Sequence, residues 1–202
     1  MLRRSFLLLV AVAVSTCCFA QNLYQQDADQ LASLLHWRAG SVVAEIGAGA
    51  GQLTLDAVQR VGPSGKVYTN ELDPEKLSHL QAIAAAHSNI VVVHGSAADT
   101  NLPPNCCDSI FMRLVYHHFT KPAEMGASLL RSLRPEGHLA VIDEEPEQGS
   151  SRPPGVPENR IGHGIPVNVL IDELTTAGFK VDSIRKDWPN QLYCVTFSKA
   201  KP

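Results

Sequence analysis

The sequence lacks any concentration of positive charge that could hold a nucleic acid. Its 17 lysine and arginine residues are scattered over 202 positions and are outnumbered by 20 acidic residues, giving a formal net charge of −3. Proteins that bind DNA or RNA neutralise backbone phosphates with clustered basic side chains. The sequence therefore argues against a nucleic-acid partner.

Cysteine is also scarce. The chain has five cysteines, and only Cys106, Cys107 and Cys194 lie beyond its first twenty residues. An odd number without a repeating spacing does not describe a disulfide framework. Cys106 and Cys107 could hold a soft metal or pair with a distant thiol, but this pair offers too few ligands for an ordinary metal site. We interpret the three residues as small, partly buried side chains.

The N-terminal apolar run is shorter than the ~20 residues that a membrane-spanning helix needs. It covers Phe6–Val14, follows Arg3 and Arg4, and precedes small residues. This order is typical of a secretory signal peptide. We predict a leader over residues 1–20 and a mature domain over residues 21–202, which would be secreted or periplasmic. An uncleaved leader would instead anchor the domain to a membrane or leave it cytosolic.

A glycine-rich turn after a short apolar run is the strongest local feature. Residues 41–55, SVVAEIGAGAGQLTL, place Gly47, Gly49 and Gly51 at alternate positions, with Glu45 just before them. Alternating glycines permit unusual backbone dihedrals and let a ligand approach the main chain. We predict a strand, a turn and the N-terminus of a helix that faces a nucleotide-like ligand. The GxGxG spacing differs from the dinucleotide fingerprint GxGxxG, which favours an adenosyl-sulfonium cofactor over NAD.

A second carboxylate follows the next predicted strand, Lys66–Asn70. Parallel strands end at the same edge of a sheet, so Glu71 is expected to project beside the glycine turn. There its carboxylate can accept both hydroxyl protons of a ribose. Asp73 precedes Pro74 and is better suited to stabilise a helix N-terminus.

Predicted strands and helices alternate along the rest of the chain, which shows no internal repeat. This alternation predicts an α/β fold with a doubly wound, Rossmann-like sheet. We expect helices at 23–37, 54–61, 74–86, 122–133 and 166–177, and further strands at 90–93, 108–114, 138–142, 180–185 and 192–198.

Four segments together resemble the class I S-adenosylmethionine-dependent methyltransferases, and within them the type 11 or UbiE-like group. The segments are VVAEIGAGAGQLTL, VGPSGKVYTNELDPEKL, the YHHF run at Tyr116–Phe119, and SLRPEGHLAVID. The resemblance covers residues 31–198. It implies a seven-stranded sheet, mostly parallel, with a C-terminal antiparallel hairpin. It also implies S-adenosylmethionine as cofactor and a small-molecule methyl acceptor. We expect a monomer that meets a membrane only if its leader is uncleaved.

The resemblance also implies which residues contact the cofactor. They are Glu45, Gly47, Ala48, Gly49, Gly51, Glu71, Leu72, Ser96, Ala97, Asp99 and Arg113. Ser96 stands where the family often has an aspartate that contacts adenine, and Asp99 is the nearby substitute. Leu114 stands where related sequences commonly have an acidic residue two positions before the tyrosine.

His117, His118 and Glu144 are the predicted catalytic residues, because each follows the end of a central strand. A base is needed only where the acceptor carries a proton that must leave, and imidazole titrates near neutrality. Adjacent residues at a strand end point in different directions, so at most one histidine should face the acceptor. The alternative is that the YHHF run packs against the next helix.

The same residues with His163 could also form a metal site, since imidazoles and a carboxylate suit zinc or iron. No pair of them has a recognised ligand spacing, so we predict no metal. Residues 146–166 are rich in Pro, Gly and Ser, and a loop of this length is usually functional. We expect it to cover the acceptor.

Two other functions remain open from the sequence. Export would separate the domain from cytosolic S-adenosylmethionine, so it could be an exported, non-catalytic module that binds the cofactor. An NAD-dependent oxidoreductase is the other alternative, against which the GxGxG spacing and the closing hairpin weigh.

Overall fold

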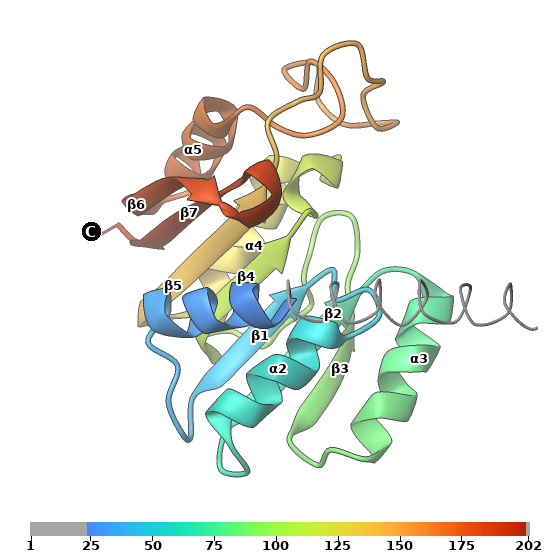
Figure 1. Cartoon of the computed structure of the whole chain (residues 1–202), viewed down its shortest axis with the longest axis vertical. Coiled ribbons are helices and arrows are strands. Elements are labelled where there is room, and N and C mark those ends of the chain that lie inside the picture. Colours follow the sequence, from blue (N-terminus) through green and yellow to red (C-terminus); the bar gives the residue numbers. More distant parts are fainter. Residues whose placement is uncertain (1–23, 201–202) are drawn as a thin grey trace, which may run out of the picture.

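One seven-stranded sheet organises the molecule (Figure 1). The computed structural model describes residues 24–200, and the leader predicted over residues 1–20 lies outside them. The strand order is β3-β2-β1-β4-β5-β7-β6. The strands are β1 Val42–Ile46, β2 Lys66–Glu71, β3 Ile90–His94, β4 Cys107–Arg113, β5 Leu133–Asp143, β6 Phe179–Trp188 and β7 Leu192–Lys199.

The first five strands are parallel, and β7 runs antiparallel to both β5 and β6. This arrangement confirms the predicted Rossmann-like sheet with its C-terminal antiparallel hairpin. The carboxyl ends of β1, β2, β4 and β5 therefore meet at one edge, where open α/β sheets bind ligands.

Helices cover both faces of the sheet, as the alternating sequence predicts. Residues 24–34 are helical and lie with α2 on one face, whereas α4 and α5 pack on the other. Figure 1 shows the first of these helices, in blue, and α2 in front of the sheet, with α4 behind it. The remaining bounds are α2 Gln52–Val61, α3 Pro74–Ala85, α4 Pro122–Ser132, α5 Val167–Thr176, and the short 3-10 helices η1 Tyr116–His118 and η2 Pro189–Gln191.

The central strands are apolar on both sides because helices cover both faces. In β4, Ile110, Phe111 and Met112 are all fully buried, and they alternate between the two apolar layers. Among residues 24–200, no helix combines the length and the apolarity that crossing a bilayer would require.

The largest shift from a predicted boundary is at the start of β5. Residues 134–137 were expected to form a turn between a helix ending at Leu133 and a strand starting at His138, but β5 already begins at Leu133. Leu133 pairs with Cys107, and the register shifts before Ser109 pairs with His138. The Pro and Gly of this segment thus belong to an irregular strand end, where β-bulges occur.

Candidate functional site

A cavity of about 520 Å³ opens at the carboxyl ends of β1, β2 and β4. This size is typical of small-molecule sites, which range over about 300–1,000 Å³. Nine of the eleven predicted cofactor residues line it: Glu45, Gly47, Ala48, Gly49, Glu71, Leu72, Ser96, Ala97 and Arg113.

The glycine turn forms one wall of this cavity. Gly47 and Gly49 have φ angles of 67° and 57°, in the left-handed region that favours glycine. A Cβ on Gly49 would meet no atom within 4 Å, whereas a Cβ on Gly47 would lie 2.5 Å from Val115 Cγ2. Gly49 therefore leaves free space for a ligand, and Gly47 permits the close approach of the β4–η1 connection.

Glu71 lies beside this turn and is held by main-chain donors. Its Oε2 accepts a hydrogen bond of 2.9 Å from the Gly49 N–H, and its Oε1 accepts one of 2.7 Å from the Leu72 N–H. Oε1 also accepts a longer hydrogen bond of 3.3 Å from the Asp73 N–H. A carboxylate has about four acceptor positions, so the remaining position on Oε2 is available for a ligand's hydroxyl group. Leu72 next to it is 52% exposed, and a flat apolar ring in the cavity would cover it.

Glu45 is the other carboxylate of this wall and is almost completely buried. Thr54 Oγ1 donates a hydrogen bond of 2.5 Å to Glu45 Oε2. Burial raises the pKa of Glu45 to about 8, with further contributions from the negative charges of Glu71 and Asp56, while the hydrogen bonds from Thr54 oppose the rise. A cation arriving in the cavity would favour the ionised form of this side chain.

The helix over residues 24–34 closes the side of the cavity. Asp27 is fully buried and accepts 2.6 Å hydrogen bonds from Arg113 Nε and from Trp188 Nε1. The Arg113 guanidinium also lies 5.2 Å from the centre of the Tyr24 ring, and both side chains line the cavity. The segment thus covers one side of the site.

Gly51 and Asp99 do not line the cavity. Gly51 precedes α2 with φ 80°, and a Cβ there would come within 2.9 Å of Leu80 on α3. Asp99 accepts hydrogen bonds of 2.8 Å from both Arg131 and Ser128. Gly51 therefore serves the packing of α3, and Asp99 joins its own loop to α4.

The connection between β4 and α4 also lines the cavity, and the sequence indicated few of its contacts. Four lining residues lie between β4 and α4 and were not predicted as contacts: Leu114, Val115, Phe119 and Thr120. Leu114 has φ 55°, which is unusual for a residue other than glycine, asparagine or aspartate. This backbone conformation turns the chain sharply from β4 into η1.

Of the three predicted catalytic residues, only His118 lines the cavity. His117 is buried, and its Nδ1 lies 2.6 Å from Asp143 Oδ1. Glu144 Oε1 lies 2.9 Å from His163 Nδ1. A single histidine of the adjacent pair therefore faces the cavity. The surroundings lower the pKa of His118, through burial first and the neighbouring His117 and His163 next.

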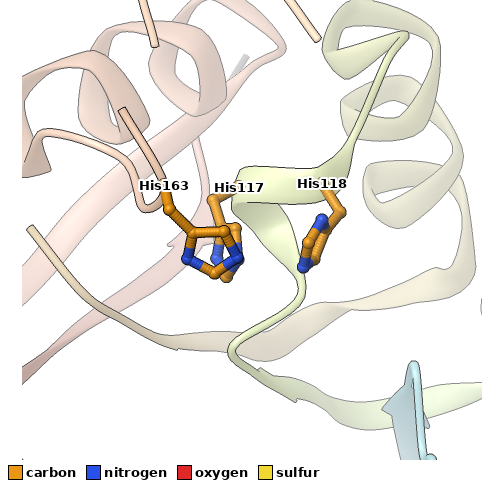
Figure 2. Close-up of side chains that lie close together, drawn as sticks. All are labelled: His117, His118 and His163. Carbon is orange, nitrogen blue, oxygen red and sulfur yellow. The ribbon is translucent and has the colours of Figure 1, made fainter. Parts of the chain in front are cut away.

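The aromatic members of the YHHF run pack in the apolar core, whereas its histidines, the buried His117 and the exposed His118, lie against His163. Tyr116 is fully buried, with its ring 5.0 Å from that of Phe119. The His117 ring lies 4.1 Å from the His118 ring and 4.6 Å from the His163 ring, measured between centroids. Figure 2 shows these three rings facing one another, two from η1 and one from the loop after β5. The packing interpretation of YHHF therefore describes its two aromatic residues, and the site interpretation describes its two histidines.

An unpredicted ion pair holds the loop that carries His163. Arg160 is fully buried and donates hydrogen bonds of 2.6 Å and 2.8 Å to the two carboxylate oxygens of Glu173 on α5. Tyr116 Oη donates to the same carboxylate over 3.1 Å. The loop is thereby fixed against η1 and α5. An arginine in a polar loop gives no sequence signal of such burial.

Comparison with known proteins yields methyltransferases. Residues 44–141 match the sequence model of a family described as a methyltransferase domain, type 11. The chain is 30% identical over 109 residues to the ubiquinone/menaquinone biosynthesis C-methyltransferase UbiE of Hahella chejuensis, covering 52% of this chain and 44% of that protein. It is 28% identical over 113 residues to protein-L-isoaspartate O-methyltransferase 2 of Archaeoglobus fulgidus, covering 55% and 49%. The chain thus spans about half the length of these relatives.

Solved structures share the fold. A SAM-dependent methyltransferase from Aquifex aeolicus superposes with a TM-score of 0.70 at 23% identity, over 85% of this chain and 88% of that one. Aeropyrum pernix fibrillarin, solved with natively bound S-adenosyl-L-methionine, gives 0.59 at 15% identity over 79% and 67%. The [4+2]-cyclase SpnF gives 0.70 at 14% identity over 88% and 82%. Since the same fold serves a cyclase, the reaction must be argued from the site.

Proposed function

We propose that this chain, which carries a class I S-adenosylmethionine-dependent methyltransferase domain, transfers a methyl group from S-adenosylmethionine to a small-molecule acceptor. The observation that carries the proposal is the cavity wall in which the Glu71 carboxylate and the free space over Gly49 lie side by side. A ribose needs a hydroxyl acceptor, and a nucleoside needs close approach to the main chain. Glu71 and the main chain at Gly49 meet these two requirements side by side.

The residues present fit this cofactor. Glu71 would accept the ribose hydroxyl protons, and the exposed Leu72 with Ser96 and Ala97 would hold the adenine ring. Glu45 would stabilise positive charge on the amino-acid end. The bound cofactor supplies an electrophilic methyl group on a sulfonium.

The chain's own contribution is to position the acceptor and exclude water. Holding two reactants in attack geometry contributes up to about 7–11 kcal/mol in favourable cases. Phe119 and Met125 provide apolar surface in the cavity, and His118 provides a ring nitrogen that can hydrogen-bond the acceptor. The relatives named C-methyltransferases support an acceptor with a nucleophilic carbon, such as an enol.

Calorimetric titration of the purified chain tests the proposal. S-adenosylmethionine and S-adenosylhomocysteine should bind, and NADH should not. Glu71→Gln should weaken binding at least about 100-fold, since two hydrogen bonds to a charged group at about 1.5–3 kcal/mol each are affected. Glu144→Gln is the matched control, because this acid lies outside the cavity lining, and it should bind like the unaltered chain.

Three results would count against parts of the proposal. Failure of a folded chain to bind either compound would refute the cofactor assignment, and equal binding by Glu71→Gln would refute the role of Glu71. Binding without methyl transfer to any acceptor, followed with a labelled methyl group, would favour the non-catalytic module instead.

Export is a separate proposal, supported by the leader predicted over residues 1–20. Fractionation of cells that express the full chain should place a shortened product outside the cytosol. A full-length product in the cytosol would contradict it.

A further inference from the structure

Three imidazoles converge where the loop after β5 meets η1. Each of His117, His118 and His163 offers one ring nitrogen, and these three atoms lie within 4.8 Å of one another. The histidines are brought together from two separate elements (Figure 2). The sequence spacing could not have indicated this cluster, because the loop between β5 and α5 determines where His163 lies.

A buried nitrogen in this cluster has no partner. His117 is 1% exposed, and its Nδ1 contacts the fully buried Asp143. Its other nitrogen, Nε2, is buried without a hydrogen-bond partner among the described residues. Buried polar atoms are nearly always satisfied, so an unpaired nitrogen beside two further imidazoles points to a missing ligand.

Two of the three rings are oriented by carboxylates. Asp143 Oδ1 lies 2.6 Å from His117 Nδ1, and Glu144 Oε1 lies 2.9 Å from His163 Nδ1. These neighbouring acids come from the carboxyl end of β5 and the residue after it. Histidines that bind metals almost always donate their other N–H to a carboxylate, a carbonyl or water. The arrangement leaves Nε2 of both histidines available for a shared ion.

We propose that His117, His118 and His163 bind a divalent transition metal, Zn²⁺ in the simplest case, through three imidazole nitrogens. Zinc prefers nitrogen ligands, and its catalytic sites use three protein ligands and keep one position open. Zinc–nitrogen bonds of 2.0–2.1 Å in a tetrahedron place the nitrogens about 3.3 Å apart. The exposed rings of His118 and His163 can rotate toward the buried His117 to reach this geometry.

The site adjoins the cavity, because His118 belongs to both. Its open position would therefore take an oxygen of the acceptor, such as that of an enol, a phenol or a carboxylate. This last step rests on the proposed methyl transfer, whereas metal binding does not. The two can fail separately.

Titration with cobalt and zinc tests the metal site without any cofactor. The full chain is first freed of metals with a chelator. Co²⁺ should then bind at one ion per chain with the visible absorption of a tetrahedral complex, and Zn²⁺ should displace it. Both His118→Ala and His163→Ala should weaken zinc binding at least 100-fold. Asp143→Asn should weaken it 10- to 100-fold, as loss of an orienting carboxylate does elsewhere.

His138→Ala is the matched control. His138 also lies near a carboxylate, with its Nδ1 3.4 Å from Asp182 Oδ2, and its ring lies 5.7 Å from that of His36. It should leave metal binding unchanged. Because His118 and His163 are exposed, their variants should fold, which circular dichroism would verify. Absence of one-to-one binding, or equal binding by His163→Ala, would overturn the proposal.

Discussion

The two walls of the cavity are built differently. The wall formed by β1, β2 and the glycine turn consists of main-chain atoms and two carboxylates, Glu45 and Glu71, held within a continuous local structure. The histidine wall, meaning His118 in the cavity lining together with the adjoining His117 and His163, which do not line the cavity, consists of side chains from η1 and from a loop fixed by a buried ion pair. A ligand held by the main chain leaves a short motif in the sequence. A site built from distant side chains is visible only after the chain has folded.

The largest expected effect comes from breaking the ion pair between Arg160 and Glu173. Its loss should disturb the histidine wall and leave the glycine wall unchanged. Removing one partner of a buried pair leaves an uncompensated charge and costs about 3–5 kcal/mol. Arg160→Met should therefore lower the free energy of unfolding by about 3 kcal/mol in chemical denaturation. It should also weaken zinc binding by displacing His163, while S-adenosylmethionine binding by the folded protein stays unchanged.

Arg152→Met is the control for this change, since Arg152 lies in the same loop but is exposed. It should alter stability by no more than about 0.5 kcal/mol. Equal stability of the two variants would show that the buried pair does not hold the loop. A parallel loss of cofactor affinity in Arg160→Met would show that the two walls are not independent.

The next largest effect is expected from two glycines with similar backbone conformations. One lies in the glycine turn and the other in the loop between β5 and α5. Gly49 and Gly149 have φ angles of 57° and 80°, and a Cβ on either would meet no atom within 4 Å. Alanine at each position should cost about 1 kcal/mol of stability, because the left-handed region disfavours a Cβ. Only Gly49→Ala should also weaken S-adenosylmethionine binding, by at least about tenfold in calorimetry. Equal affinity of the two variants would place the ligand elsewhere.

The same contrast explains how much could be predicted from the sequence. The alternation of strands and helices predicts the α/β sheet, and the strand ends and glycine spacing predict the position of Glu71, all of which are local properties. The antiparallel hairpin and the cofactor contact of Glu45 are what the resemblance to the methyltransferases implies. Most of the predicted cofactor residues do line the cavity. Asp99 does not, because its pairing with Arg131 depends on how its loop packs against α4.

The histidine wall was underestimated for a physical reason. Asp143 orients His117, and Glu144 orients His163, across the gap between β5, η1 and the following loop. No regular spacing relates these residues in the sequence. The unpaired Nε2 of His117 and the burial of Arg160 are properties of the folded chain alone. The prediction that no metal binds here is therefore replaced by the proposal of a three-histidine site.

The smallest expected effect is a proton released by Glu45 when the cofactor binds. With a pKa of about 8, Glu45 is protonated in the free protein at neutral pH. A cationic ligand in the cavity would lower this pKa and release a proton. Affinity should then rise with pH and level off above about 8. Calorimetry at pH 7 in buffers of different ionisation enthalpy should detect up to one proton per cofactor.

Glu45→Gln removes the titrating carboxyl group, so any pH dependence that remains in this variant belongs to other groups in the site. Its proton release should disappear and its affinity for the cofactor should no longer rise between pH 6 and 8.

The pH dependence of folding stability tests the raised pKa of Glu45 independently of any ligand. The folded chain holds a proton on Glu45 that the unfolded chain, with an ordinary pKa of 4.5, has lost. The stability contributed by Glu45 is thus complete below that pH and is lost as the pH rises to about 8. If the unaltered chain and Glu45→Gln show the same pH dependence in both measurements, Glu45 is already ionised in the free protein. The glycine wall would then carry two negative charges before any ligand arrives.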